Sequence, residues 1–441
     1  MARAKKEAAL TPEVRLQAAL VPDWEWPYKL PENWCWLKLV ESFDNHTDSK
    51  KKIKQKDYLV KGKLAVVDQG QELIGGYTND VEKSYSGALP IVIFGDHTRC
   101  IKFVDFPFAQ GADGVKVLRP KPFYLPKAFY YALQSVNIPN LGYRRHFPLF
   151  NKFSIPLPPF AEQQRIVDRI ESLFAKLDEA KEKAQAVVDS FETRKAAILR
   201  KAFTGELTAK WREEHGVGME SLEKKRLSDV VTEFKYGTSE KSDYNNKGIP
   251  VLRIPNIGDN GIDLSDIKYL NHRNVDSESQ IHEGDILIIR SNGSRDLVGK
   301  AVLVPELGCE YAYASFLIRA KPNHSIINAH YLTIFLNSTD ARGQMFRRAK
   351  SSAGINNINT KELGAISLTV PSLPEQDEIV HIINEMMDKD QQSKEAAEAV
   401  LDQIDLMKKS ILARAFRGEL GTNDPSEESA VELLKEIIRR G

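Results

Sequence analysis

Apolar side chains recur at alternating spacings of four and three along two long stretches of the chain. The first stretch has them at Ile166, Ile170, Leu173, Leu177, Ala180, Ala184, Val187, Phe191 and Ile198. The second has them at Ile379, Ile383, Met386, Ala397, Val400, Ile404, Met407 and Ile411, and is interrupted by the polar Asp390 and Ser393. A heptad stripe of this kind is the seam of a coiled coil, so we predict that the two helices pack on each other. The alternative is that each helix packs separately into a globular core.

The two stretches are copies of one unit. Leu157–Leu207 aligns without a gap with Val370–Leu420, and 21 of the 51 aligned positions are identical. Each copy opens with a proline-rich approach and a Glu-Gln pair, at Glu162–Gln163 and Glu375–Gln376, and then has neither proline nor glycine until a closing G-E-L. Because proline suits a helix entry and glycine a helix end, we predict that each copy is one helix of about 40 residues, close to 60 Å long.

The segments before each helix have a different pattern. Short β-rich runs such as KLAVVD, ALPIVIF, DILIIRS and AVLVPE alternate there with Gly, Asn, Asp and Pro turns, which predicts globular α/β domains. The predicted fold class is therefore α+β: two globular α/β domains separated by two long antiparallel coiled-coil helices, with a pseudo-two-fold internal repeat.

The predicted order along the chain has seven parts. They are an N-terminal segment (1–20), a first domain (21–156), a first long helix (157–207), a linker (208–220), a second domain (221–369), a second long helix (370–420) and a C-terminal tail helix (421–441). The tail helix has Val431, Leu434, Ile437 and Ile438 on one side. We expect that side to close the structure against the N-terminal segment.

Composition and charge narrow the class of protein. The 441 residues are 42% hydrophobic and 28% charged, with no run of the roughly 18 apolar residues that suggests a membrane span. The charged N-terminus lacks an apolar signal core, and three scattered cysteines form no CxxC pair, so we expect a cytoplasmic protein without disulfides. Residues 21–160 carry a net charge of +5 and residues 221–369 a net charge of +2, which permits nucleic-acid binding without requiring it.

The helix repeat and its flanking motifs resemble the specificity subunit of type I restriction-modification systems. The resemblance covers almost the whole chain and rests on P-P-F-A-E-Q-Q-R-I-V (Pro158–Val167), P-E-Q-D-E-I-V (Pro374–Val380) and the paired A-F-x-G-E-L helix ends. Fragments of both domains agree with it. They are F-A-Q-G-A-D-G-V-K-V-L (Phe108–Leu118), Y-R-R-H-F (Tyr143–Phe147), G-I-P-V-L-R-I-P-N-I (Gly248–Ile257), G-D-I-L-I-I-R-S-N-G-S (Gly284–Ser294), V-G-K (Val298–Lys300) and S-A-G-I-N-N-I (Ser352–Ile358).

The resemblance implies that the domains are target recognition domains, each of which binds one half of a split, asymmetric DNA site. It implies that the partners are double-stranded DNA, two methyltransferase subunits and, where the complex also cleaves DNA, two restriction subunits. S-adenosylmethionine, ATP and magnesium are then expected on those partner subunits, and the chain directs their adenine methylation and restriction.

The apparent catalytic motifs of the chain each lack a residue or a spacing that the chemistry requires. Leu157 precedes Pro158-Pro159-Phe160 where an adenine methyltransferase needs Asn or Asp to hold the amino group. The stretch Gly293–Ala301 is one residue too long for a phosphate-binding loop and ends in alanine. The nine histidines show no HExxH or clustered spacing. We therefore expect a chain that is not an enzyme by itself and that holds no metal or cofactor.

Candidate DNA contacts follow from the chemistry of base and phosphate recognition, which uses Arg, Lys, Asn, Gln and small hydroxyls on exposed elements. In the second domain they are Arg253, Asn256, Arg290, Ser291, Asn292, Ser294, Arg295, Arg347, Arg348, Lys350, Ser352, Asn356 and Asn357. In the first domain they are Lys61, Gln69, Tyr143, Arg144, Arg145 and His146. The alternatives are ordinary polar loops, a turn at Asn356, and a structural contact of Tyr143 and His146.

A function from another class is compatible with the same layout. The chain could be a non-catalytic coiled-coil scaffold whose globular domains bind ligands or peptides. Sequence-specific, salt-sensitive retention on DNA together with a methyltransferase would distinguish the two functions.

Overall fold

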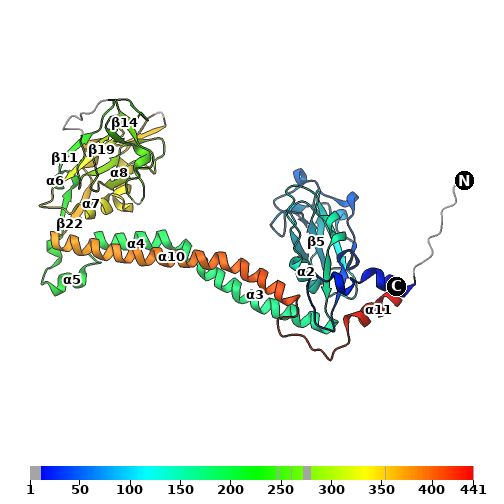
Figure 1. The fold of residues 1–441 in the computed structure, drawn as a ribbon. Coiled ribbons are helices and arrows are strands. Elements are labelled where there is room, and N and C mark those ends of the chain that lie inside the picture. The colour runs from blue at the N-terminus through cyan, green and yellow to red at the C-terminus, as the bar shows by residue number, and fades with distance from the viewer. Residues whose placement is uncertain (1–10, 246–247, 260, 272–279, 353, 441) are drawn as a thin grey trace. The chain divides into compact units, whose positions relative to one another are not determined.

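The chain divides into two compact units. One comprises the residues up to Ala184 together with those from Ala399, and the other comprises Gln185–Glu398. The computed structural model describes residues 11–245, 248–259, 261–271, 280–352 and 354–440 (Figure 1). The side chains of Lys350, Ser351 and Ser352 lie outside this description. Each unit holds one globular domain and parts of the long helices.

The first unit builds its domain on a four-stranded antiparallel sheet of order β2-β8-β5-β6 and a three-stranded sheet of order β4-β3-β7. Its helices are α1 (Pro12–Ala19), α2 (Pro126–Ser135), the first part of α3 (Phe160–Asp189), the last part of α10 (Leu373–Ala415) and α11 (Ala430–Arg440). Its strands are β1 (Cys35–Lys38), β2 (Phe43–Asn45), β3 (Leu64–Val67), β4 (Gly76–Thr78), β5 (Ile91–Gly95), β6 (Ile101–Val104), β7 (Phe108–Gln110), β8 (Val115–Pro120) and β9 (Ser154–Leu157).

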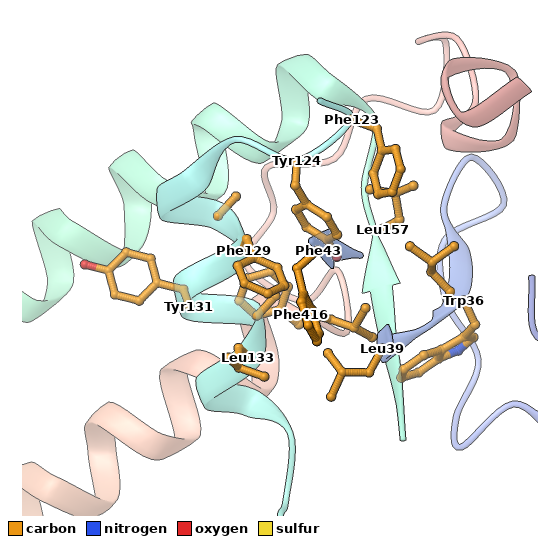
Figure 2. Close-up of a cluster of buried hydrophobic side chains, with 14 of the residues drawn as sticks. Trp36, Leu39, Phe43, Phe123, Tyr124, Phe129, Tyr131, Leu133, Leu157 and Phe416 are labelled. Atoms are coloured by element: carbon orange, nitrogen blue, oxygen red, sulfur yellow. The ribbon is translucent and has the colours of Figure 1, made fainter. Parts of the chain in front are cut away.

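The fully buried strand β5 explains where the core of the first domain lies. Successive side chains of a strand point to opposite faces. Val92 and Phe94 therefore pack with the aromatic residues of α2, and Ile91 and Ile93 pack with a second cluster on the other face. Figure 2 shows the first cluster, in which Phe416 of the C-terminal segment lies among side chains of the domain. The core of this unit thus needs the end of the chain.

The C-terminal segment closes this unit against its N-terminal residues. Helix α11 contacts α1, and Leu434 is buried in the same core as Phe416. Several hydrogen bonds join the two ends, including one from Asn33 Nδ2 to the Asp424 carbonyl (2.9 Å). Tyr28 Oη donates to the Phe416 carbonyl (3.2 Å), Trp34 Nε1 donates to the Asn423 side chain (3.1 Å), and the Ala430 amide donates to the Asn33 carbonyl (2.9 Å). The expected contact between the tail helix and the N-terminal segment is confirmed.

The second unit repeats the arrangement with more strands. Its sheets have the orders β11-β19-β15-β17, β12-β14-β13-β18 and β16-β21-β20, and β10 pairs with β22. Its helices are the end of α3, α4 (Phe191–Phe203), α5 (Ala209–Glu214), α6 (Leu227–Val230), α7 (Ala329–Leu336), α8 (Thr339–Arg348), α9 (Thr360–Gly364) and the first part of α10. Its strands are β10 (Glu223–Arg226), β11 (Val231–Tyr236), β12 (Ser242–Asp243), β13 (Pro250–Leu252), β14 (Lys268–Leu270), β15 (Ile286–Ile289), β16 (Ser291–Asn292), β17 (Ala301–Leu303), β18 (Ala312–Tyr313), β19 (Leu317–Pro322), β20 (Lys350–Ser352), β21 (Ile355–Asn357) and β22 (Ser367–Val370).

The long helices differ from the prediction in the first copy. The second copy is one helix of 43 residues, α10, as predicted. The first copy is interrupted at Ser190 between α3 and α4, so the prediction of a single helix there is wrong. The Ser190 hydroxyl donates to the Ala186 carbonyl (2.6 Å), and Arg194 donates to the Val187 carbonyl (3.1 Å). Side chains that take helix carbonyls in this way bend helices.

The helices pack in antiparallel fashion within each unit. In the second unit, Lys394 Nζ lies 4.7 Å from the centre of the Phe191 ring, and Arg194 Nε pairs with Asp390 Oδ1 at 2.6 Å. In the first unit, Lys408 Nζ pairs with Asp178 Oδ1 at 2.5 Å. Residues further along α3 and α4 thus contact residues that come earlier in α10, which is the antiparallel arrangement. Asp390, which interrupts the apolar stripe, is the partner of Arg194.

The predicted pairing residues fall into three groups. Ile166, Ile170, Ile379, Ile383 and Ile404 are buried, and Leu173, Leu177, Val187, Phe191, Ile198 and Ile411 are partly buried. The first four also belong to the cores of the globular domains, so packing into a domain core occurs at the ends of the helices. Met386, Val400 and Met407 are 38%, 41% and 46% exposed, and their assignment to the seam is wrong. Their neighbours Met387, Leu401 and Lys408 are the partly buried ones, one position further along the heptad.

Candidate nucleic-acid interface

A buried glutamine fixes each globular domain to its long helix. Gln163 donates from Nε2 to the carbonyls of Phe123 and Pro158 (2.8 and 3.1 Å) and accepts at Oε1 from the Leu125 amide (2.8 Å). Gln376 makes the corresponding three hydrogen bonds in the second unit. Because each side chain ties the start of a long helix to the start of α2 or α7, it sets the direction in which the domain leaves the helix.

The glutamate of each Glu-Gln pair joins the start of one copy to the end of the other. Within the first unit, Thr422 Oγ1 donates to Glu162 Oε1 at 2.6 Å. Within the second unit, Thr208 Oγ1 donates to Glu375 Oε1, also at 2.6 Å. Both carboxylates are fully buried. The duplicated G-E-L ends therefore close onto the duplicated Glu-Gln starts, which explains why the two motifs recur together.

An arginine completes each of these two junctions, but the two arginines differ in burial. Arg212 pairs with Glu375 and has 4% of its side chain exposed. Arg165 pairs with Glu162 at 2.9 Å and with Glu427 at 2.7 Å, and has 38% of its side chain exposed. Burial raises the pKa of the Glu162 carboxyl, against the lowering effect of the Thr422 hydrogen bond and of Arg165.

The structure joins two sequence-distant groups of candidate residues in the second domain. Strand β16 pairs with β21, so that Ser291 lies opposite Asn357 and Asn292 lies opposite Asn356. Strand β20 extends this sheet on the other side of β21. We call this small sheet, together with the residues that flank it, the second-domain surface. Its residues are Tyr236, Arg290, Ser291, Asn292, Ser294, Arg295, Asn356 and Asn357.

The side chains of the second-domain surface differ in their exposure to solvent. Ser294 and Arg295 are exposed, whereas Ser291 is buried. Arg295 stacks on the Phe346 ring with its Cζ 5.1 Å from the ring centre. Asn356 Nδ2 donates to the Gly293 carbonyl at 3.3 Å, so it also serves the turn that was the alternative for this residue.

The remaining candidates near this surface lie in and after α8. Arg347 is exposed. Arg348 donates to the carbonyls of Gln344 (3.1 Å) and Ala365 (3.4 Å). Lys350 and Ser352 belong to β20 by their backbone, and their side chains lie outside the description.

Two candidates in the second domain have a structural role. Asn256 is buried, donates to the carbonyls of Asp263 and Asp266 (2.8 and 2.9 Å), and accepts from the Arg253 amide (2.8 Å). Its predicted contact with DNA is therefore wrong, since all of these bonds hold a turn. The Arg253 guanidinium pairs with the Asp266 carboxylate at 3.2 Å and stabilises the same turn.

His146 also has a structural role, and its predicted contact with DNA is wrong. The ring is fully buried, Nε2 accepts from the Leu141 amide (3.1 Å), and Nδ1 lies 2.9 Å from the Asp96 carbonyl. The ring therefore closes a short loop, which presents Tyr143, Arg144 and Arg145 to solvent.

The loop closed by His146 lies beside a second loop of the first domain. Tyr143 stacks on His97 with ring centres 4.8 Å apart, and the His97 amide donates to the Gln69 side chain at 3.2 Å. Gln69, His97, Tyr143, Arg144 and Arg145 form what we call the first-domain surface. Lys61 is exposed on a different loop, and among the described residues no hydrogen bond or ion pair joins it to this surface.

Two residues of these surfaces carried no signal in the sequence pattern. His97 and Tyr236 act through rings stacked on a neighbour, and that neighbour is distant in the chain in both cases. Gln110, which belongs to neither surface, lines a cavity of about 370 Å³ in the first domain. It is 4% exposed, its Oε1 accepts from the Asp48 amide, and its Nε2 has no partner among the described atoms.

No helix of the described residues is long and apolar enough to cross a membrane. Over the same residues, no three His, Cys, Asp or Glu side chains gather as ligands for a metal ion.

Known proteins resemble this chain in sequence and in fold. The chain is 30% identical over 301 residues to the Type I restriction enzyme EcoKI specificity subunit of Escherichia coli K12, covering 65% of this chain and 64% of that subunit. It is 28% identical over 305 residues to the StySPI specificity subunit of Salmonella potsdam, with the same coverage. The aligned stretch thus spans a little under two thirds of these relatives.

A solved structure of the HsdS subunit from Thermoanaerobacter tengcongensis has the same fold. It matches 90% of this chain and all of that chain with a TM-score of 0.59 at 19% identity. A chain from a study of complex assembly and conformational transition of the type I R-M system matches with a TM-score of 0.61, also at 19% identity. The predicted fold class, two mixed helix-sheet domains with an internal repeat, is confirmed.

The model of the family described as Type I restriction modification DNA specificity domain matches twice, at residues 31–188 and 219–401. Each match takes in one globular domain and most of the long helix that follows it. Because the two matches cover more than half of the chain, the protein belongs to the type I restriction modification DNA specificity domain family.

Proposed function

We propose that this chain is the DNA-binding specificity subunit of a type I restriction-modification complex. In this function each globular domain binds one half of a bipartite, asymmetric DNA site. The chain is not an enzyme by itself but directs partner subunits for adenine methylation and restriction. The relatives named above are described as specificity subunits of type I restriction enzymes, and the proposal extends that description to this chain.

The observation that carries the proposal is the second-domain surface. Arg290 and Asn292 meet Asn356 and Asn357, more than fifty residues further along the chain, at one small sheet through the β16–β21 pairing. The major groove of DNA admits a two-stranded β-ribbon, and Arg and Asn are the side chains that bind guanine and adenine edges there. The first-domain surface offers the same chemistry with Gln69, Arg144 and Arg145, the two arginines exposed.

An apolar face of α10 supports the docking of methyltransferase subunits. Val400 and Met407 of the first unit are exposed and lie seven residues apart, and Leu406 beside them is exposed as well. Residues at multiples of seven lie on one side of a helix, which is the pattern that a further helix packs against. Two methyltransferase subunits, one for each half of the pseudo-repeat, and two restriction subunits complete the proposed complex.

The cofactors of the complex belong to the partners in this proposal. S-adenosylmethionine serves the methyltransferase subunits, and ATP and magnesium serve the restriction subunits. The residues of this chain supply hydrogen-bond donors and acceptors to DNA and an apolar helix face to protein.

The long helices set the spacing between the half-sites in this proposal. Helix α10 runs without interruption over 43 residues and contributes to both units. Each end of it is joined to its unit by a buried glutamate junction, at Glu375 and through Thr422 to Glu162.

The test is to map methylated adenines in cells with and without the gene, and to measure DNA retention of the complex purified with its methyltransferase subunits. The expected result is one bipartite motif that disappears with the gene, and an affinity for that motif that falls steeply as salt is raised. Retention that does not depend on DNA sequence, with no change in methylation, would instead favour a scaffold that binds peptides or ligands.

A further inference from the structure

Arg290 directly precedes strand β16 of the second-domain surface, and its backbone is fixed on both sides. It follows the fully buried strand β15. Its amide donates to the Phe316 carbonyl (2.9 Å), and its carbonyl accepts from the Ile358 amide (2.9 Å). The base of the side chain therefore has one position, set by three segments of the domain.

The guanidinium of Arg290 is held mainly by an aromatic ring. Its Cζ lies 4.4 Å from the centre of the Tyr236 ring. Its Nε donates to Asn357 Oδ1 at 3.4 Å and its Nη1 to the Ser315 carbonyl at 3.5 Å. Both hydrogen bonds are long and therefore weak, so stacking on the ring is the contact that fixes the plane of the group.

Tyr236 is itself fixed at both ends. Its backbone lies in the β11–β19 ladder opposite Ile318, and its hydroxyl accepts from the Thr360 amide at 3.2 Å. Tyr236 is 38% exposed, so a ligand that reaches this surface can contact the residue. A ring held in this way presents its guanidinium partner in one orientation.

The guanidinium keeps donors for a ligand. Of its five N–H groups, the described residues accept two, one from Nε and one from Nη1. The three that remain, one on Nη1 and two on Nη2, have no acceptor among the described residues. An arginine with a fixed plane and free terminal donors suits the O6 and N7 atoms of guanine, which accept two parallel hydrogen bonds.

We propose that Arg290 binds a guanine in the half-site of the second domain, and that Tyr236 is the positioning residue that aims it. This inference rests on the proposed function and adds to it a base and the residue pair that selects it. A phosphate contact needs no fixed plane. Exposed Arg347 in the last turn of α8 is the kind of side chain that suits a phosphate.

The experiment uses the full chain purified with its methyltransferase subunits. DNA duplexes carrying the methylated motif, with each base pair of both half-sites changed in turn, compete for binding. In the wild-type complex, one G·C pair of the second half-site should discriminate strongly. Arg290→Gln and Arg290→Lys should reduce the discrimination at that pair by about 10- to 100-fold, because a bidentate arginine–guanine pair supplies an effect of that order. All positions of the first half-site should keep their discrimination, which also reports that the complex is folded.

Two substitutions of Tyr236 test the positioning role. Tyr236→Phe keeps the stacking ring and should keep most of the discrimination, whereas Tyr236→Leu removes the ring and should weaken discrimination at the same base pair. Arg347→Gln is the matched control, since loss of an exposed arginine should lower affinity for all duplexes alike and leave the motif unchanged.

Three outcomes would overturn the proposal. The second half-site could contain no guanine whose replacement changes the affinity. Arg290→Gln could lower affinity equally for every duplex, which would make Arg290 a phosphate contact. Tyr236→Leu could leave discrimination unchanged, which would remove the positioning role. A wild-type complex without any sequence preference is a different failure, because it contradicts the proposed function itself and the guanine contact with it.

Discussion

Replacing Glu375 by alanine should destabilise the second unit far more than replacing Glu162 destabilises the first. Both carboxylates are fully buried at corresponding places of the repeat, and each accepts from a threonine hydroxyl at 2.6 Å. The difference lies in the arginine that each would leave behind. Arg212 would be buried without a carboxylate partner, whereas Arg165 is partly exposed and keeps Glu427 at 2.7 Å.

The magnitudes follow from that difference. Removing one partner of a buried ion pair costs about 3–5 kcal/mol, because the other charge stays buried and unpaired. We expect this cost for Glu375→Ala. For Glu162→Ala we expect about 1–2 kcal/mol, the value of one lost hydrogen bond and part of an exposed ion pair.

Hydrogen exchange of the central strands measures the two units separately. Amides of β15 report on the second unit and those of β5 on the first, since the slowest exchange of a unit follows its cooperative opening. Glu375→Ala should speed exchange of β15 by roughly 100- to 1,000-fold or more, at 1.4 kcal/mol for each factor of ten, and change β5 much less. In Glu162→Ala the effect should fall on β5 and be about tenfold.

A double substitution separates the buried charge from loss of packing. Glu375→Leu with Arg212→Leu removes both charges and should be more stable than Glu375→Ala alone, because two apolar groups leave no unpaired ion. If Glu162→Ala costs as much as Glu375→Ala, or if the double variant is the least stable of all, the argument from arginine burial is incorrect.

Three further outcomes are expected. Glu162→Gln should abolish a pH dependence of the stability of the first unit. Burial raises the folded-state pKa of Glu162 above its ordinary value of 4.5, so the folded state holds this proton more tightly than the unfolded state does. The stability that this group contributes is therefore lost as the pH rises from about 4.5 through the raised pKa, and unfolding at a series of pH values measures that slope. His146→Ala should free the loop that presents Tyr143 and lower affinity for the first half-site by roughly tenfold, with the second half-site unchanged in the same binding assay. Val400→Glu together with Met407→Glu should weaken methyltransferase binding in a co-purification assay without altering the stability of the free chain, since both side chains are exposed.

The sequence pattern located the long helices because an apolar stripe sustained over many heptads is a strong signal. It could not place the seam within one residue where two large apolar residues are adjacent, as at Met386 and Met387 or Val400 and Leu401. It also gave no sign of the interruption at Ser190, since that interruption comes from side chains that bond helix carbonyls and not from proline or glycine.

The candidate site was predictable by residue type and not by arrangement. Arginine and asparagine clusters were found one loop at a time, but the pairing that places Asn292 opposite Asn356 joins residues 64 positions apart. The two wrong predictions of DNA contact concern side chains that are buried in the fold. His146 and Asn256 have the chemistry of DNA-binding side chains, and only the fold shows that their polar atoms contact backbone groups of the protein instead. Tyr236 was missed for the converse reason, since its function depends on a guanidinium that the fold brings over its ring.

Lengthening both long helices by one heptad should lengthen the spacer of the recognised site. Seven residues inserted after Lys183 in α3 and seven after Asp402 in α10 keep the seam in phase, because the seam repeats every seven residues. The antiparallel contacts on either side of these positions, Asp178 with Lys408 and Arg194 with Asp390, remain intact. Two turns of helix add about 10.5 Å, which corresponds to about three base pairs at ~3.4 Å each.

The added base pairs also turn the second half-site around the DNA axis. Three base pairs are about a third of a helical turn of 10 to 10.5 base pairs, so the lengthened protein should prefer the longer spacer but bind it more weakly than the wild type binds its own. Methylation mapping measures the spacer, and binding assays measure the loss of affinity. An insertion in α10 alone should break the pairing and abolish methylation, which serves as the control. If the doubly lengthened protein still methylates the original spacer, the helices do not set the distance, and the half-sites must be positioned by the partner subunits or by the DNA.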